Sequence, residues 1–307
     1  MALPGKDFTK GDLLVLAFDH RGSFMEKLFG IKGRSPTASE TAQISDYKKV
    51  VYEGFLKAIE QGVPKEIAGI LVDEQFGAAI AADAKSRGIT FAMPCEKSGQ
   101  EEFDFEYGND FPSHVEKFSP NFCKVLVRYN TQADKASNAS QLERLKKLND
   151  YLRQAGTAYL FELLVPATSE QLAKLNNDKK TYDAQMRPKL MVDAMAAIQG
   201  AGVEPDIWKM EGVDSPSDAA AIVAQAQANG RKAGVITLGR GESAEKVAEW
   251  LKVGAGMGGI VGFAVGRTIF WDALENLKQC KLTREQAVAV IADNYKRFAQ
   301  LWQNERK

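Results

Sequence analysis

Eight short apolar runs recur along the chain, and segments with a helical spacing of apolar residues separate them. Within each run successive positions are apolar, which is typical of strands in a parallel sheet that helices cover. The runs are residues 12–18, 67–73, 89–95, 123–129, 158–164, 206–210, 233–239 and 259–265.

The intervening segments are amphipathic, as expected for helices that pack one face on a sheet. Two helical faces are the sets Tyr47, Val50, Val51, Phe55, Ile59 and Leu190, Met191, Ala194, Met195, Ile198. Eight strands alternating with about eight helices in 307 residues predict an α/β protein, a single (β/α)8 barrel over residues 1–307. A doubly wound sheet is the competing fold, and periodicity alone does not separate the two.

Two segments lie outside this simple alternation. Residues 100–120 follow the third strand as a long insertion, which we expect to lie over the catalytic face. Residues 284–302 form a strongly amphipathic last helix, which either seals the barrel exterior or meets a partner subunit in a homo-oligomer.

The charge balance narrows the range of partners. Lys plus Arg number 40 and Asp plus Glu also number 40, so no global basic field favours nucleic acid or an acidic membrane surface. No apolar run reaches the roughly 20 residues that span a bilayer, and the N-terminus lacks a secretory apolar core. The three scattered cysteines form no CxxC pair, so we expect a reduced, cytoplasmic protein.

The turns after the seventh and eighth strands suggest phosphate binding. Arg240 lies between Gly239 and Gly241, and Arg267 follows Gly266 at a helix start. Barrels often bind phosphate here, because glycines admit the anion to backbone amides and arginine offers a fork of donors. The alternative is a pair of ordinary turns with solvated arginines.

Lys209 ends an apolar run behind Trp208, which is unusual because lysine is rarely buried without a role. Burial and neighbouring cations would lower its pKa, and a neutral amine attacks a ketone to form a Schiff base. The alternative is a lysine that extends to solvent or pairs with Glu162 or Glu211.

Two carboxylates are further candidates. Glu162 lies within the apolar run "YLFELLVP" and is either a proton shuttle or half of a buried ion pair. Asp19, at the end of the first strand, is either a ligand of a substrate hydroxyl or a helix N-cap.

Metal chemistry has less support. His20 and His114 are the only histidines, so a zinc site with several histidine ligands is hard to assemble. An oxygen-ligand magnesium site from Asp73, Glu74, Glu162 or Glu211 is an alternative that no ligand motif singles out.

Several motifs together resemble a known family. They are "LLVLAFDHRGSF", "ILVDEQFG", "FELLVPAT", "YDAQMRPKLMVDA", "GVEPDIWKMEGVD", "GVITLGRG" and "VGFAVGRTIFWDAL". As a set they resemble the 2-deoxy-5-keto-gluconate-6-phosphate aldolase domain of inositol breakdown, which is often fused behind a sugar kinase. "LAFDHRG", "ILVDEQFG" and "CEKSG" are more distantly similar to tagatose-1,6-bisphosphate aldolase.

The resemblance implies a Schiff-base aldolase that needs no cofactor or metal. It implies that Lys209 is the Schiff-base lysine, that Glu162 transfers protons and that Asp19 touches the substrate. It matches Lys124 to a strand-four lysine of the same site. Arg187, which the tagatose pattern lacks, either holds a substrate carboxylate or starts a helix ahead of Pro188.

We therefore expect a class I aldolase that cleaves a phosphorylated keto sugar acid, with 2-deoxy-5-keto-gluconate 6-phosphate as the substrate that the resemblance implies. The products would be dihydroxyacetone phosphate and malonate semialdehyde. The alternatives are a related aldolase for tagatose or sulfofructose phosphates, a magnesium-dependent lyase or isomerase, and a non-catalytic sugar-phosphate sensor.

Overall fold

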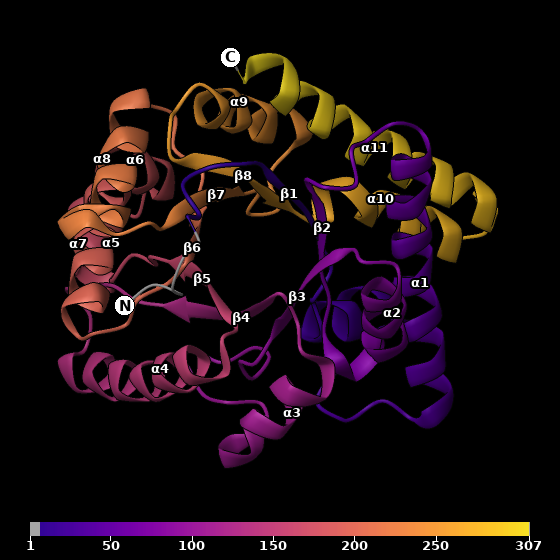
Figure 1. Cartoon of the computed structure of the whole chain (residues 1–307), viewed down its shortest axis with the longest axis horizontal. Helices are drawn as coiled ribbons and strands as arrows, with labels where there is room; N and C mark the ends of the chain where they lie inside the picture. The colour runs from indigo at the N-terminus through magenta and orange to yellow at the C-terminus, as the bar shows by residue number, and fades with distance from the viewer. Residues whose placement is uncertain (1–6, 307) are drawn as a thin grey trace.

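Eight parallel strands close into a barrel in the computed structural model of the chain, which describes residues 7–306 (Figure 1). The strands are β1 (Leu13–Ala17), β2 (Ala68–Leu71), β3 (Thr90–Pro94), β4 (Phe122–Arg128), β5 (Ala158–Leu164), β6 (Ile207–Glu211), β7 (Gly234–Leu238) and β8 (Ile260–Val265). Each strand pairs with the next, and β8 pairs with β1 to close the ring. The predicted (β/α)8 barrel is therefore confirmed, and the doubly wound alternative is wrong.

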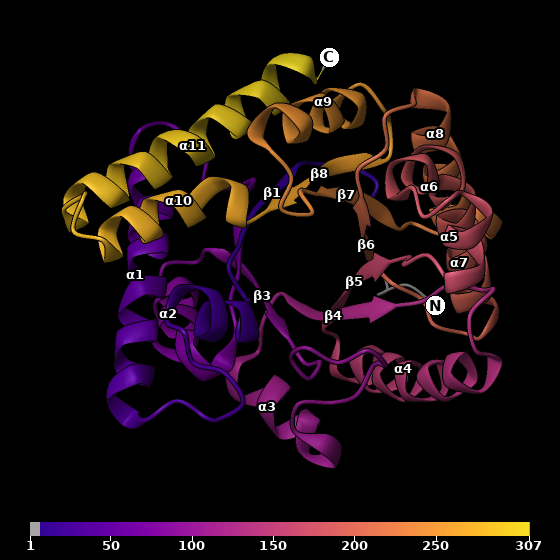
Figure 2. The same cartoon turned by 180° about the vertical axis from the view of Figure 1, so that it is seen from behind.

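Helices follow every strand and form the outer ring, as the views from both ends show (Figures 1 and 2). They are α1 (Ala38–Glu60), α2 (Glu74–Ser86), α3 (Phe111–Phe118), α4 (Lys135–Ala155), α5 (Ser169–Lys174), α6 (Lys179–Gln185), α7 (Arg187–Gly200), α8 (Pro216–Ala226), α9 (Ala244–Ala255), α10 (Arg267–Lys278) and α11 (Arg284–Glu305). Short η helices are η1 (Phe24–Leu28), η2 (Gly108–Asp110) and η3 (Ala228–Gly230). The expectation of about eight helices was too low, because α5, α6 and α11 are additional to one helix per strand.

The insertion expected at residues 100–120 has a different structure from the prediction. Its second half is η2 and α3, so it supplies the barrel's own third helix. Its first half stays at the C-terminal end of β3, where Phe105 bridges Glu96 and the Glu106 carboxylate lies 2.8 Å from Arg21. Only this first half borders the strand ends where barrel active sites lie.

Helix α11 covers the outside of the barrel, as its amphipathic pattern predicts. It packs against α1, α9 and α10, and its buried face includes Tyr295, Phe298 and Trp302. The hydroxyl of Tyr295 donates to the carbonyl of Leu14 on β1, which ties the helix to the barrel wall. Among the described residues 7–306, no helix is both long and apolar enough to cross a membrane.

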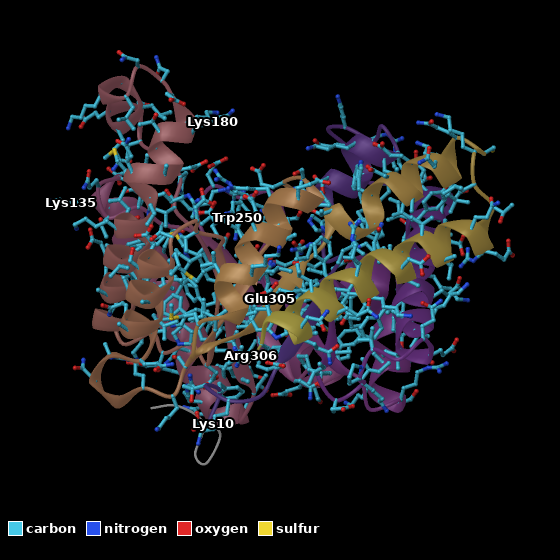
Figure 3. The ribbon with its side chains drawn as sticks, turned by 90° about the horizontal axis from the view of Figure 1, so that it is seen from above. Lys10, Lys135, Lys180, Trp250, Glu305 and Arg306 are labelled. Atoms are coloured by element: carbon cyan, nitrogen blue, oxygen red, sulfur yellow. The ribbon has the colours of Figure 1, made fainter. Side chains whose placement is uncertain are left out.

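The barrel interior changes from apolar to charged along its axis. Small and branched side chains fill the lower part, and Phe8 closes the N-terminal end against Phe122. Inward positions nearer the C-terminal ends of the strands hold Asp19, Lys124, Glu162 and Lys209, all buried. Lys10 and Lys180 lie at opposite ends of the barrel axis in Figure 3. Helices α5 and α6 project beyond the barrel at the end marked by Lys180.

Candidate active site in the barrel mouth

Lys209 and Glu162 are direct neighbours on adjacent strands. Their Cα atoms pair in the β5–β6 register, and alternation along each strand turns both side chains into the barrel. The Lys209 amine lies 2.9 Å from Oε2 of Glu162, and both residues are buried. Their contact is the buried ion pair that the sequence left open as an alternative, and their catalytic roles stay a prediction.

Lys124 is the centre of the charged cluster. Its side chain points from β4 into the barrel. The amine lies 2.8 Å from Oδ2 of Asp19 and 2.8 Å from Oε1 of Glu96. It also lies 2.9 Å from Oε2 of Glu162, so one oxygen of Glu162 contacts two lysines.

The charges of this cluster stabilise one another against the cost of burial. Burial alone would lower the pKa of Lys124, but Asp19, Glu162 and Glu96 raise it well above its usual value. Burial would raise the pKa of Asp19 and of Glu162, yet Lys124 and Lys209 lower both. Lys124 is therefore a fixed cation between ionised carboxylates at neutral pH.

Glu96 completes the cluster, and sequence reasoning missed it because its place after the third strand was the one signal that pointed to it. Burial raises the pKa of Glu96, and Lys124 and Arg21 offset that effect only in part. Arg21 donates to the Glu96 backbone carbonyl at 2.8 Å and approaches its carboxylate at 3.6 Å. Three carboxylates and three cations thus meet in the mouth, a balance that makes the buried charges tolerable.

Asp19 is not a helix cap. The first helical turn after β1 is η1, whose N-cap is Ser23, and the Asp19 carboxylate instead contacts Lys124. The N-cap interpretation of Asp19 is therefore wrong. Contact of Asp19 with a substrate hydroxyl stays a prediction.

His20 was not selected from the sequence as a site residue, yet it lies beside the cluster. Its ring packs edge-on against Phe270, and Nδ1 is buried without a hydrogen-bond partner. Burial lowers the pKa of His20 to about 4, and the charges of Arg267, Lys48 and Lys209 act in the same direction against Asp19. The imidazole is therefore neutral near pH 7.

Arg187 starts helix α7, with Pro188 in the first turn, which agrees with the second of the two alternatives for this residue. Its side chain is buried and its donors are occupied by the Asp183 carboxylate at 3.0 Å and the Gly212 carbonyl at 3.2 Å. This arrangement therefore does not favour direct binding of a substrate carboxylate by Arg187.

Arg240 does not present an unoccupied fork. Its Nη1 lies 2.7 Å from Asp183 and its Nε lies 3.1 Å from Glu211. Arg240 groups with Arg187 through these shared carboxylates, and its role in phosphate binding stays a prediction.

Arg267 lies next to Gly241, one of the glycines predicted to bind phosphate. Gly241 has a φ of 77°, a conformation that favours glycine, and a Cβ there would lie 2.5 Å from Nη2 of Arg267, so the guanidinium would have to shift. Gly266 is the N-cap of α10 without a side-chain cap, and Gly239 packs against Val265.

A cleft of about 370 Å³ opens at this place, a size suited to a small ligand. It is lined by Lys27, Gly241, Glu242, Ser243, Ala244, Arg267, Thr268, Trp271 and Asp272. Lys27 of η1 was not anticipated, because nothing local in the sequence links it to the seventh strand. Of the predicted phosphate residues, Arg267 and Gly241 line this cleft.

Comparison with known proteins gives one family. Its model matches residues 5–306, nearly the whole chain. The chain belongs to the family DUF2090. That family is described as an uncharacterized protein conserved in bacteria. No curated protein matches the chain.

The carboxylates proposed for magnesium do not converge in this DUF2090 chain. Asp73 caps α2 and pairs with Lys48, while Glu74 contacts His114 and Lys117 on α3. Glu162 and Glu211 have the partners described above. Within residues 7–306, no three acidic, histidine or cysteine side chains are grouped as a metal site would require.

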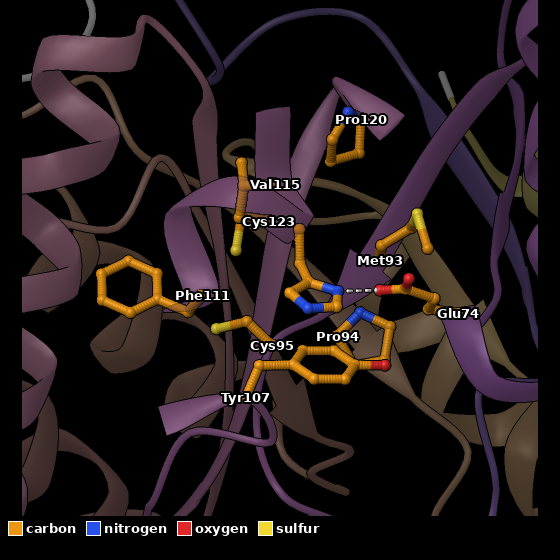
Figure 4. A pocket seen from close by; sticks show the side chains of 10 residues that line it. Glu74, Met93, Pro94, Cys95, Tyr107, Phe111, Val115, Pro120 and Cys123 are labelled. Atoms are coloured by element: carbon orange, nitrogen blue, oxygen red, sulfur yellow. Dashed lines mark hydrogen bonds and ion pairs between the residues drawn. The ribbon is translucent and has the colours of Figure 1, made fainter. Parts of the chain in front are cut away.

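A second cavity lies outside the barrel wall, between α2, β3 and α3 (Figure 4). The Glu74 carboxylate lies 2.6 Å from Nδ1 of His114, and the His114 ring stacks on Tyr107. The cavity measures about 20 Å³, room for about one water molecule. It is too small for a sugar.

Proposed function

We propose that the protein is a class I aldolase that cleaves a phosphorylated keto sugar acid. The observation that carries the proposal is the Lys209 amine, held inside the barrel mouth 2.9 Å from the Glu162 carboxylate. The barrel fold is compatible with an enzyme, and a buried amine with an adjacent carboxylate is suited to Schiff-base chemistry. The resemblance of the sequence supports 2-deoxy-5-keto-gluconate 6-phosphate as the substrate.

The surroundings of the two lysines favour Lys209 as the nucleophile. An ammonium group has three N–H donors, and three carboxylates lie within 2.9 Å of the Lys124 amine. Those contacts keep Lys124 protonated and unreactive. The Lys209 amine contacts only one carboxylate among the described residues, so fewer contacts have to break before it approaches a carbonyl carbon.

Glu162 would move the protons of the reaction. It accepts the proton of the Lys209 ammonium, and the neutral amine then attacks the substrate ketone. As the carbinolamine loses water, Glu162 returns a proton to the departing hydroxyl and a protonated Schiff base forms. The iminium withdraws electrons from the neighbouring carbon–carbon bond. That bond breaks once the hydroxyl on the departing fragment gives up its proton to Glu162, which leaves the other fragment on Lys209 as an enamine. Glu162 then gives this proton to the enamine carbon, and water hydrolyses the Schiff base to release the ketone product and the Lys209 amine.

Lys124 would hold Glu162 in place throughout. It contacts the same oxygen as Lys209, so it keeps the carboxyl group of Glu162 aligned as Lys209 changes its charge. Asp19, on the opposite side of Lys124, is positioned for a substrate hydroxyl. The products would be dihydroxyacetone phosphate and malonate semialdehyde.

The cleft beside Arg267 would hold the substrate phosphate. Arg267, Lys27 and Thr268 line it, and the uncapped start of α10 adds backbone amides. Binding that remote group would fix the ketone over Lys209, which converts binding energy into orientation.

Borohydride reduction in the presence of dihydroxyacetone phosphate tests the proposal. We expect a covalent adduct on Lys209, located by peptide mass spectrometry. Lys124 and Lys48 serve as internal controls, because both are buried lysines of the same chain. No adduct, or an adduct on either control lysine, would refute Lys209 as the Schiff-base residue.

A further inference from the structure

Two arginines and two carboxylates form a closed ring at the rim of the mouth. Asp183 on α6 contacts Arg187 at 3.0 Å and Arg240 at 2.7 Å. Glu211, at the end of β6, contacts Arg240 at 3.1 Å and approaches Arg187 at 3.9 Å. Each arginine thus has both acids as partners, and the four charges cancel.

The ring is asymmetric in its contact with solvent. The side chains of Arg187 and Glu211 are each 4% exposed, whereas those of Arg240 and Asp183 are 34% and 28% exposed. Glu211 is also fixed from below, because its Oε2 accepts from the Val165 amide at 3.2 Å. Arg187 and Glu211 are therefore buried in the barrel wall, whereas Arg240 and Asp183 are accessible to solvent.

The backbone of Arg240 is held in a conformation that arginine rarely adopts. Its φ is 53°, in the left-handed region, which costs a residue with a side chain free energy. Arg267 donates to the Arg240 carbonyl at 3.3 Å and thereby helps to hold this turn. The strained turn directs the guanidinium toward the rim instead of into the cleft beside Arg267.

The ring also lies close to the reactive amine. Glu211 is two residues beyond Lys209 on β6, so both side chains point to the same inner face of the barrel. A ligand group bound by Arg240, the partner of Glu211, would therefore lie on the same side of the barrel as the Lys209 amine.

We propose that the Asp183–Arg240 ion pair is exchangeable, and that an oxyanion group of the substrate replaces the Asp183 carboxylate on Arg240. This inference rests on the proposed function, and it adds the residue that selects a charged substrate. A carboxylate or a phosphate oxygen matches the guanidinium as Asp183 does. A neutral sugar end does not, because it would break the Asp183–Arg240 contact without supplying a charge in its place.

Binding of simple anions tests the exchange without requiring turnover. Malonate represents a carboxylate end and inorganic phosphate represents a phosphate end, each titrated by calorimetry into the full chain. Asp183→Asn removes the competing charge while keeping the shape of the side chain. We expect it to tighten binding of one of these anions about two- to fivefold, the range that a partly exposed ion pair supports.

Asp193→Asn is the matched control. Asp193 pairs with Lys189 on the outer side of α7, so this variant removes the same charge without touching either arginine. We expect unchanged anion affinity. Arg240→Gln should abolish the binding that Asp183→Asn tightens, and thermal unfolding of each variant reports whether the fold is kept.

Each outcome has a definite meaning. Tighter malonate binding alone assigns the ring to a carboxylate end, and tighter phosphate binding alone assigns it to a phosphate end. Unchanged or weaker binding of both anions in folded Asp183→Asn would overturn the exchange. If borohydride traps an adduct on Lys209 but Asp183→Asn leaves anion affinity unchanged, only this inference is refuted. If Asp183→Asn tightens anion binding but no adduct forms, only the proposed aldolase activity is refuted.

Discussion

Lys124 and Lys209 both place their amines 2.9 Å from the same oxygen, Oε2 of Glu162. The two lysines are otherwise unequal, because Lys124 also contacts Asp19 and Glu96. Lys124 therefore has three carboxylate partners, whereas Lys209 has one among the described residues. Because of this difference, removing each amine should change the stability of the protein to a different extent.

We predict that Lys124→Met destabilises the protein far more than Lys209→Met. Without Lys124, three buried carboxylates lose a cation, and breaking a buried ion pair from one side costs about 3–5 kcal/mol. Without Lys209, Glu162 still contacts Lys124, so the loss should be clearly smaller. Urea unfolding at pH 7 measures both. Equal losses would contradict the view of Lys124 as the structural cation.

His20 should remain uncharged across the usual working range of pH. Burial lowers its pKa from 6.5 to about 4, so its NMR ring resonances should stay constant from pH 8 to 5 and shift only near pH 4. There are two histidines in the chain, so His20→Gln assigns the signal directly. A ring that titrates near pH 6.5 would show that the imidazole is not enclosed.

The same shift predicts how stability depends on pH. Because the folded pKa lies below the unfolded value, unfolding takes up a proton on His20 between pH 4 and 6.5. Its stabilising contribution is complete above pH 6.5 and is lost as the pH falls toward 4. His20→Gln should therefore show a shallower decline of unfolding free energy in this window than the unchanged protein.

The strands could be predicted from the sequence because the information is local. Each run that is apolar on both faces, such as residues 158–164, corresponds to an observed strand. Helices α5 and α6 could not be predicted in the same way, since they are six and seven residues long and bury few side chains. Length and burial set the strength of a periodic pattern, and short projecting helices supply neither.

The site was predictable residue by residue but not as an arrangement. Lys209 and Glu162 stand out because each is a charge within an apolar run. The contact of Lys124 with Asp19 joins residues 105 positions apart, and no local pattern records it. For the same reason the pairing of Arg240 with Asp183 was missed, since the sequence does not show which acid the α6 segment brings to the rim.

Closure of the barrel should depend on Gly262. Its φ is 154°, and a Cβ there would lie 1.9 Å from the Leu13 carbonyl oxygen on the paired strand β1. Gly262→Ala would force β8 away from β1, and overpacking of this kind costs about 1–3 kcal/mol or more. Gly258→Ala is the control, because a Cβ at Gly258 meets no atom within 4 Å. Thermal unfolding should show a lower Tm for the first variant only.

Glu162→Gln should separate proton transfer from binding. The amide keeps the size of the side chain but neither accepts the proton of Lys209 nor returns one to a leaving hydroxyl. Because general acid–base catalysis contributes about 10²–10⁴-fold, we expect kcat to fall by that factor while KM changes little. Glu96→Gln is the matched control, since Glu96 contacts Lys124 and Arg21 and has no contact with Lys209 in the part of the chain that is described. It should lower kcat much less. Steady-state kinetics with the phosphorylated keto acid and rapid trapping with borohydride together decide the point, and equal losses in the two variants would remove Glu162 from its proposed role.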